Sequence, residues 1–168
     1  SLALSPALAS ATDSLRAIPH ASLAIASVGI AANQARLPRG FGFLVAREHG
    51  VRILGAITPA NFLPGRAPAG CAALSVFIGG ALDPAAIDLN DADLRALVER
   101  DLARTIGLAG PPRVFQLQRW RDALPQYDLQ HAARVRTYAA AETAHPGLHL
   151  AGNWRDGTAL AERIEQMH

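Results

Sequence analysis

The sequence predicts an α+β fold in which a mostly antiparallel sheet carries packed helices. Four apolar segments of strand length follow one another between residues 21 and 78. Short turns join the first three, and a loop over 59–70 that is rich in proline and glycine precedes the fourth. Antiparallel strands need only such short connections, whereas parallel strands need a crossover of roughly a dozen residues. At 168 residues, half of them hydrophobic, the chain is long enough to bury a sizeable core.

The first half of the chain is expected to begin with a helix and to continue with four strands. Pro6 is placed as a first helical residue, apolar residues recur at helical spacing up to Ala17, and Pro19 ends the pattern. Residues 21–33 are apolar on both faces of a strand, which predicts a central strand covered from two sides. The other three strands are expected at residues 41–46, 51–58 and 71–78.

The second half is expected to contain a fifth strand between two helices. Asn90 is placed to cap a helix that Gly107 ends. The apolar stripe of this helix consists of Leu94, Leu97, Val98, Leu102 and Ile106. Side chains alternate over residues 113–120, which predicts the strand. A long helix is expected from Tyr127 to about Ala144. Its inward-facing residues are predicted to be Leu129, Ala132, Val135 and Ala139.

The last stretch of the chain is the candidate site. Residues 148–151 have the pattern of a short apolar strand, a turn bounded by Gly152 and Gly157 follows, and then apolar residues recur at helical spacing. The backbone N–H groups of residues 157–160 would have no partner within that helix and would form a partly positive end. Such an end can face an anionic or electron-rich ligand. An ordinary strand-turn-helix connection explains the same pattern.

Composition excludes several classes of function. The formal net charge is +2, and the 16 basic residues are all arginines spread along the chain, so no nucleic-acid partner is expected. The one cysteine, Cys71, cannot form an internal disulfide and suits a reducing compartment. No apolar run is long enough to span a bilayer, and the first residues lack the features of a secretory signal. These observations favour a cytoplasmic location.

Several common catalytic and cofactor motifs are absent from the sequence. It has no Gly-x-Gly-x-x-Gly dinucleotide fingerprint, no Gly-x-Ser-x-Gly nucleophile elbow and no phosphate-binding loop. His145 and His149 have the spacing of a metal-binding pair on a helix. Pro146 and Gly147 prevent a helix there, so no metal site is expected.

Large apolar side chains on the expected strands have two explanations. These residues are Phe41, Leu44, Phe77 and Trp120. Core packing explains any one of them. A pocket for a flat apolar molecule would need the same kind of side chain.

Four segments of the sequence resemble motifs of the FAD-dependent protoporphyrinogen oxidases, in that family's order and at about its spacing. They are GFGFLV at 40–45, SVFIGG at 75–80, ALPQY at 123–127 with His131, and AGNWRDGTAL at 151–160. The resemblance covers essentially the whole chain but only the later part of a full-length enzyme, whose dinucleotide fingerprint lies near its amino terminus. The chain has Arg121 where the family often has proline, and Gln130 where it often has glycine.

The resemblance implies an FAD-dependent oxidase of the flavin amine-oxidase superfamily that acts on a tetrapyrrole in porphyrin and heme biosynthesis. The implied contacts to the isoalloxazine side of FAD come from Gly152, Asn153, Gly157, Thr158, Ala159 and Leu160. The implied substrate-binding residues are Phe41, Gly42, Leu44 and Phe77. The catalytic residues stay unknown, because no general base can be named.

The resemblance also implies how the chain is organised and what it needs. Residues 1–122 correspond to a substrate-binding sheet with helices, and residues 123–168 to a helix and a strand-helix segment of the flavin domain. Without the phosphate-binding half, the chain alone is expected to be inactive. It is expected to need the missing N-terminal part of the same enzyme or a homo-oligomer partner. An apolar substrate is compatible with peripheral contact at the inner face of the cell membrane.

Two alternatives stay open. The chain could be a non-catalytic module that binds an apolar ligand or serves as a scaffold. It could also belong to another member of the flavin amine-oxidase superfamily.

Overall fold

The computed structural model describes residues 5–46, 50–155 and 157, which form two compact units. One unit comprises residues 21–123 and contains most of the sheet, and the other comprises residues up to 20 and from 124 onward. The first 20 residues therefore group with the C-terminal segment, whereas the sequence prediction placed them with the sheet. The assignment of 1–122 to substrate and 123–168 to flavin stays a prediction.

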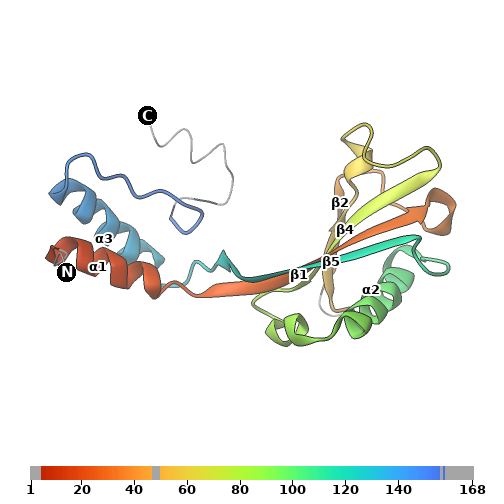
Figure 1. Ribbon diagram of the computed structural model, residues 1–168, viewed down its shortest axis with the longest axis horizontal. Coiled ribbons are helices and arrows are strands. Elements are labelled where there is room, and N and C mark those ends of the chain that lie inside the picture. The colour runs from red at the N-terminus through yellow and green to blue at the C-terminus, as the bar shows by residue number, and fades with distance from the viewer. Residues whose placement is uncertain (1–4, 47–49, 156, 158–168) are drawn as a thin grey trace. The chain divides into compact units, whose positions relative to one another are not determined.

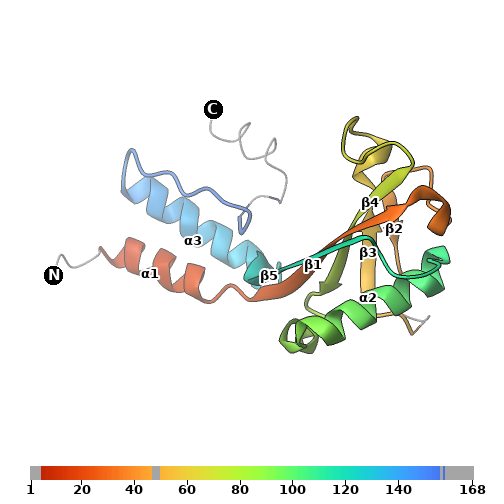
Figure 2. The same cartoon turned by 45° about the vertical axis from the view of Figure 1, so that its right-hand side comes forward.

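A five-stranded sheet forms most of the larger unit, in the order β2-β3-β4-β1-β5; Figures 1 and 2 together label its strands. Its strands are β1 (His20–Ala31), β2 (Gly42–Leu44), β3 (Ile53–Ile57), β4 (Cys71–Gly79) and β5 (Val114–Pro125). β1 and β3 both pair antiparallel with β4, and β2 pairs antiparallel with β3. These pairings confirm the predicted antiparallel sheet and, with the helices, the α+β class.

The helix α2 (Asp91–Ile106) covers one face of this sheet (Figures 1 and 2). As predicted, the Asn90 side chain accepts a hydrogen bond from the Asp93 backbone N–H at 2.9 Å, and Gly107 ends the helix with a φ of +66°. The five residues of the predicted apolar stripe are each at most 5% exposed and lie in the core. None of the described helices is long and apolar enough to cross a membrane.

The second face of β1 differs from the prediction. Ala24, Ala26, Val28 and Ile30 are buried on the side that α2 covers. On the other side Leu23 is buried, Ile25 is half-buried and Ser27 is exposed. The remaining helical pieces described in this unit are three short 3₁₀ turns: η1 (Ala32–Gln34), η3 (Pro59–Asn61) and η4 (Pro84–Asp88). Within the described residues, the prediction of cover from two sides is therefore correct for one side and only partly correct for the other.

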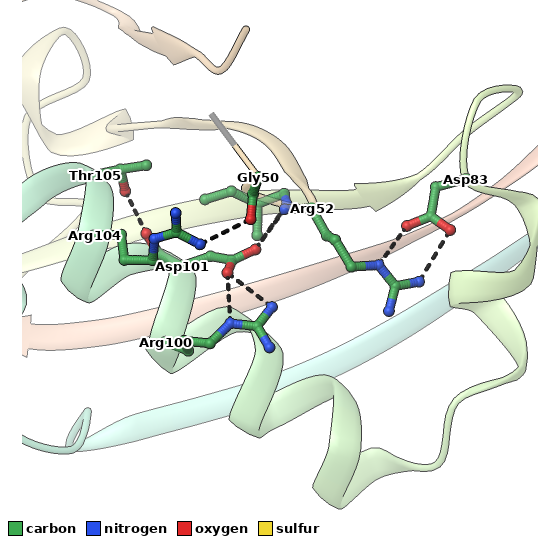
Figure 3. A network of polar contacts seen from close by, with 8 residues as sticks. Gly50, Arg52, Asp83, Arg100, Asp101, Arg104 and Thr105 are labelled. Carbon is green, nitrogen blue, oxygen red and sulfur yellow. Dashed lines mark hydrogen bonds and ion pairs between the residues drawn. The ribbon is translucent and has the colours of Figure 1, made fainter. Parts of the chain in front are cut away.

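A buried carboxylate joins α2 to the start of β3 (Figure 3). Asp101 is fully buried, and its Oδ2 accepts hydrogen bonds from the backbone N–H groups of Arg52 at 2.7 Å and Ile53 at 3.1 Å. Its Oδ1 pairs with the Arg100 guanidinium at 2.9 Å. The Arg52 side chain in turn pairs with Asp83 at 2.8 Å. A buried charge needs such partners, and these contacts fix the start of β3 against α2.

In the smaller unit, the helices α1 (Pro6–Arg16) and α3 (His131–Ala144) lie side by side (Figures 1 and 2). Ala11 of α1 is buried in a cluster with Tyr138 and Ala141 of α3. Ser5 caps α1, and its hydroxyl lies 2.9 Å from Nε2 of His145, which follows α3. The predicted helix over residues 5–17 is thereby confirmed.

The inward face predicted for α3 is wrong. Leu129 precedes the helix and is fully exposed, and Ala132 and Ala139 are also exposed. The buried residues are instead Tyr138 and Ala141. Alanines occupy so many positions of this helix that several faces look equally apolar, and the large Tyr138 ring decides which one packs.

The strand predicted at residues 148–151 does not form. The sheet in the described part of the chain has five strands, and this segment pairs with none of them. Its backbone is held differently, because the Leu150 N–H donates to the Glu142 carboxylate at 2.8 Å. A strand depends on a neighbour that a single segment cannot reveal. The helix predicted after Gly157 lies outside the described residues.

Candidate functional site

The segment from Gly152 to Gly157, named here the Gly152–Gly157 turn, is held from α3 by an ion pair. The Arg155 guanidinium binds both oxygens of Glu142, at 2.6 and 3.1 Å, and also donates to the Leu150 carbonyl at 2.6 Å. The Arg155 bond and the Leu150 N–H hold the pKa of Glu142 below its usual range. The two charges are both largely shielded from water, so this pair fixes the geometry of the turn more firmly than a surface pair would.

A single hydroxyl bridges the two ends of the turn. The Tyr127 O–H donates to the Asn153 carbonyl at 2.8 Å and accepts from the Gly157 N–H at 2.9 Å. The Tyr127 ring stacks on His131 with the ring centroids 4.0 Å apart. The N–H of Gly157, predicted to be free for a ligand, is therefore already bonded to Tyr127.

An aromatic pair packs behind the turn. The Trp154 ring meets Tyr138 edge-on, with centroids 4.9 Å apart. Tyr138 is fully buried, and its hydroxyl has no hydrogen-bond partner within the described part of the chain. Burial raises the pKa of Tyr138. A side chain at Gly152 would collide with the Trp154 indole, and Gly157 has a φ of +122° that other residues rarely adopt.

The sequence predicted six cofactor-binding residues, and the structure describes three of them. Gly152, Asn153 and Gly157 lie in one turn. Thr158, Ala159 and Leu160 lie outside the described residues. The role of all six stays a prediction. The residues that shape the turn, Tyr127, Glu142 and Arg155, carried no assigned role. Tyr127 stood within a recognised motif, but neither pairing is visible from sequence spacing.

The face of the sheet opposite α2, named here the open face, carries the candidate substrate-side residues. In β4, alternate residues from Cys71 to Phe77 are half-buried on this face, while those between them are buried in the core. Leu44 pairs with Gly55, and Gly55 pairs with Phe77, so Leu44 and Phe77 lie in one cross-strand row. A side chain at Gly55 would collide with the backbone of Phe43 and Leu44, so packing between the strands explains this glycine.

The other two substrate-side residues have different surroundings. Phe41 is 62% exposed and stacks on Phe62, with ring centroids 4.4 Å apart. Gly42 has no room for a side chain because the backbone of Ala56 and Ile57 lies against it. Packing between strands thus explains Gly42 without a ligand. The roles of Phe41, Gly42, Leu44 and Phe77 in binding stay predictions.

Next to this row, the open face is hollowed into a pocket of about 340 Å³. It lies over the ends of β1, β4 and β5 and under the loop that carries Arg66 and Pro68. Among the residues that the structure describes, its lining is mostly apolar and includes no Asp or Glu. In the described residues, no cluster of three or more His, Cys, Asp or Glu side chains could hold a metal ion.

Comparison with known proteins shows the family to which the chain belongs. The model of the family described as flavin containing amine oxidoreductase matches residues 3–162, so the chain belongs to that family. Within it, the chain is similar to protoporphyrinogen oxidases. It is 38% identical to the chloroplastic protoporphyrinogen oxidase 1 of Spinacia oleracea over 131 residues, which cover 76% of this chain and 23% of that protein.

Two further comparisons agree with this assignment. Coproporphyrinogen III oxidase of Bacillus subtilis is 29% identical over 128 residues, covering 76% of this chain and 27% of that protein. A provisionally assigned protoporphyrinogen oxidase from Exiguobacterium sp. 255-15 superposes with a TM-score of 0.75 at 25% identity, over 91% of this chain and 34% of its own. Reduced UDP-galactopyranose mutase superposes with a TM-score of 0.62 at 13% identity, over 85% and 30%, which shows the fold alone. The chain spans about a quarter of the length of the curated relatives it matches.

Proposed function

We propose that this chain is part of an FAD-dependent oxidase that acts on a porphyrinogen-like tetrapyrrole. Its membership of a flavin-containing family supports a flavin, and the names of its relatives support this substrate class. The observation that carries the proposal is the Gly152–Gly157 turn, because two independent sets of contacts hold it in one shape. A cofactor-contacting backbone needs such support.

The residues of the turn fit the isoalloxazine side of a flavin. Gly157 has no side chain and a φ of +122°, which suits the close approach of a flat ring, whereas at Gly152 the Trp154 indole occupies the space of a side chain. When bound, a flavin would supply the hydride acceptor, and the protein would supply orientation. Tyr127 and Arg155 fix the backbone that would face the ring. The phosphate-binding fingerprint is absent from this sequence, so another segment would have to hold the ADP half.

The open face is the candidate wall for the substrate. Leu44 is 90% exposed, and Phe77 lies in the same row of the sheet. Apolar side chains of this kind can contact a flat apolar ring without hydrogen bonds. These residues would orient the substrate and exclude water, and none of them can transfer a proton.

We further propose that the partner of the chain is a segment with a dinucleotide-binding fold. That segment would be either the N-terminal part of the same enzyme or a second subunit of a homo-oligomer. The location proposed is the cytoplasm, with peripheral contact at the inner face of the cell membrane.

A flavin titration of two proteins tests the proposal. The 168-residue chain and the complete protein that contains it are each titrated with FAD, while flavin fluorescence is followed and circular dichroism checks that each is folded. The complete protein should bind FAD stoichiometrically, and the chain alone should not bind at submicromolar concentration. Tight binding by the chain alone would contradict the need for a second segment. A complete protein that binds porphyrin but no flavin would favour the non-catalytic module.

A further inference from the structure

The pocket on the open face owes its shape to small residues. Its floor includes Ser27 and Gly29 of β1 and Ala73 and Ser75 of β4. A methyl group added at Gly29 would lie only 3.1 Å from Cβ of Val114, so the neighbouring strand already covers that glycine. Small side chains beside larger ones therefore leave a depression at this end of the open face.

Two arginines add positive charge to this otherwise apolar pocket. Arg66 and Arg113 both line it, and both are exposed. Neither side chain forms a hydrogen bond or an ion pair with any residue that the structure describes. Arg52, Arg119 and Arg134, in contrast, each pair with a carboxylate at 2.6 to 2.8 Å. The arginines of the pocket thus keep their donors available to a ligand.

We infer that this pocket binds the carboxylate-bearing edge of an apolar ring ligand, with Arg66 and Arg113 as its anion partners. A guanidinium matches a carboxylate in shape and can donate two parallel hydrogen bonds to it. A freely hydrated anion such as phosphate does not suit the apolar floor. Phosphate would make none of the ring contacts there that an apolar ligand makes. The inference rests on the proposed function. It adds which end of the open face would bind the carboxylates of the substrate.

The size and position of the pocket suit one edge of a macrocyclic ligand better than the whole macrocycle. A volume of about 340 Å³ is at the lower end for small-molecule sites. Ser75 in its floor is two residues from Phe77 on the same face of β4. A ring that rests over Phe77 can therefore continue into the pocket, while its carboxylates reach the arginines at the far end.

Protoporphyrin IX and its dimethyl ester provide a matched pair of probes. Both have the same ring, and the ester lacks the two carboxylates. Binding of each to the complete protein is measured by porphyrin fluorescence, and flavin content is determined in the same samples. The free acid should bind about tenfold more tightly than the ester, since two rim ion pairs are worth up to about a factor of five each. Added salt should weaken binding of the acid and leave the ester unchanged.

Substitutions then assign the preference to the two arginines. Arg66→Gln and Arg113→Gln should each weaken binding of the acid about two- to fivefold and leave the ester unchanged. Arg136→Gln removes the same charge from an exposed position on α3 and should change neither. Ala73→Leu fills the floor and should weaken both probes.

The outcomes separate this inference from the proposed function. Equal binding of acid and ester, or unchanged acid binding in both arginine variants, would overturn the inference while leaving the flavin and substrate class intact. No binding of either probe to a flavin-loaded protein would overturn both the inference and the substrate class. Loss of flavin from the wild-type protein would count against the proposed function itself.

Discussion

Removal of the Tyr127 hydroxyl should open the Gly152–Gly157 turn without unfolding the protein. Tyr127→Phe deletes two hydrogen bonds, one to Asn153 and one from Gly157, and leaves the ring free to stack on His131. A typical hydrogen bond contributes about 0.5–1.5 kcal/mol net, and Tyr127 is 46% exposed, so water replaces part of the loss. We expect the turn to lose about 1–2 kcal/mol, which raises its opening equilibrium roughly 5- to 30-fold.

Hydrogen–deuterium exchange measured by mass spectrometry follows the turn directly. Peptides that cover residues 150–157 should exchange faster in Tyr127→Phe, whereas peptides from the sheet unit should not change. Tyr138→Phe is the matched control, because its hydroxyl has no partner in the described part of the chain. Its removal should be neutral or slightly stabilising.

The same two variants test the link between the turn and the flavin. In the complete protein, Tyr127→Phe should lower flavin retention or shift the visible flavin spectrum, and Tyr138→Phe should do neither. If exchange over 150–157 stays at the wild-type rate in Tyr127→Phe, the hydroxyl does not hold the turn. If exchange rises and the flavin is unaffected, the turn does not face the cofactor.

Three further changes have expected results. Asp101→Ala leaves the part-buried N–H of Arg52 and the buried N–H of Ile53 without an acceptor. It should lower the free energy of unfolding by about 2–4 kcal/mol in urea titrations, and Asp101→Asn should lower it less; a loss below about 0.5 kcal/mol would contradict this role. Because the pKa of Glu142 is lowered on folding, its ion pair with Arg155 stabilises the fold above the usual pKa of 4.5, and this stability is lost as the pH falls through the pKa of the folded state. Trp154 fluorescence should therefore change below about pH 4.5, and Glu142→Gln should abolish that change. Gly157→Val forces a branched side chain to a φ of +122° and should reduce flavin content with helical circular dichroism retained; full flavin occupancy would show that the turn tolerates the distortion.

Local sequence signals predicted the sheet unit well. The stripe of α2 and its caps lie within one helix, so residues close in sequence determine both. The pairings of β2 with β3 and of β3 with β4 also join strands that follow one another in the chain, whereas the pairing of β1 with β4 does not. The same reasoning gave the wrong buried face for α3. Its many alanines leave the apolar stripe undefined, and the packing of Tyr138 determines which face is buried.

The support of the candidate site could not be predicted, because it depends on pairs that are distant along the chain. Tyr127 reaches Gly157 across 30 residues, and Glu142 reaches Arg155 across 13. No periodicity links such positions. The sequence could identify the turn, through its glycines, but only the fold shows that the first of its predicted donors is already occupied by Tyr127.

Two of the sequence predictions failed for the same reason, and that reason is informative. β1 has apolar residues on both faces, yet in the described part of its unit one face lacks a covering helix. Residues 148–151 have a strand pattern and no strand beside them. Each pattern predicts a neighbour that the described residues do not supply. A sequence selected within a longer protein retains the surface chemistry of its contacts, and the relatives of this chain are about four times as long as the matched region. We therefore interpret the open face and residues 148–151 as surfaces that a flavin-binding segment and an apolar ligand would cover. This interpretation predicts that exchange at residues 148–151 slows when the chain is combined with that segment, and that exchange in α2 stays the same.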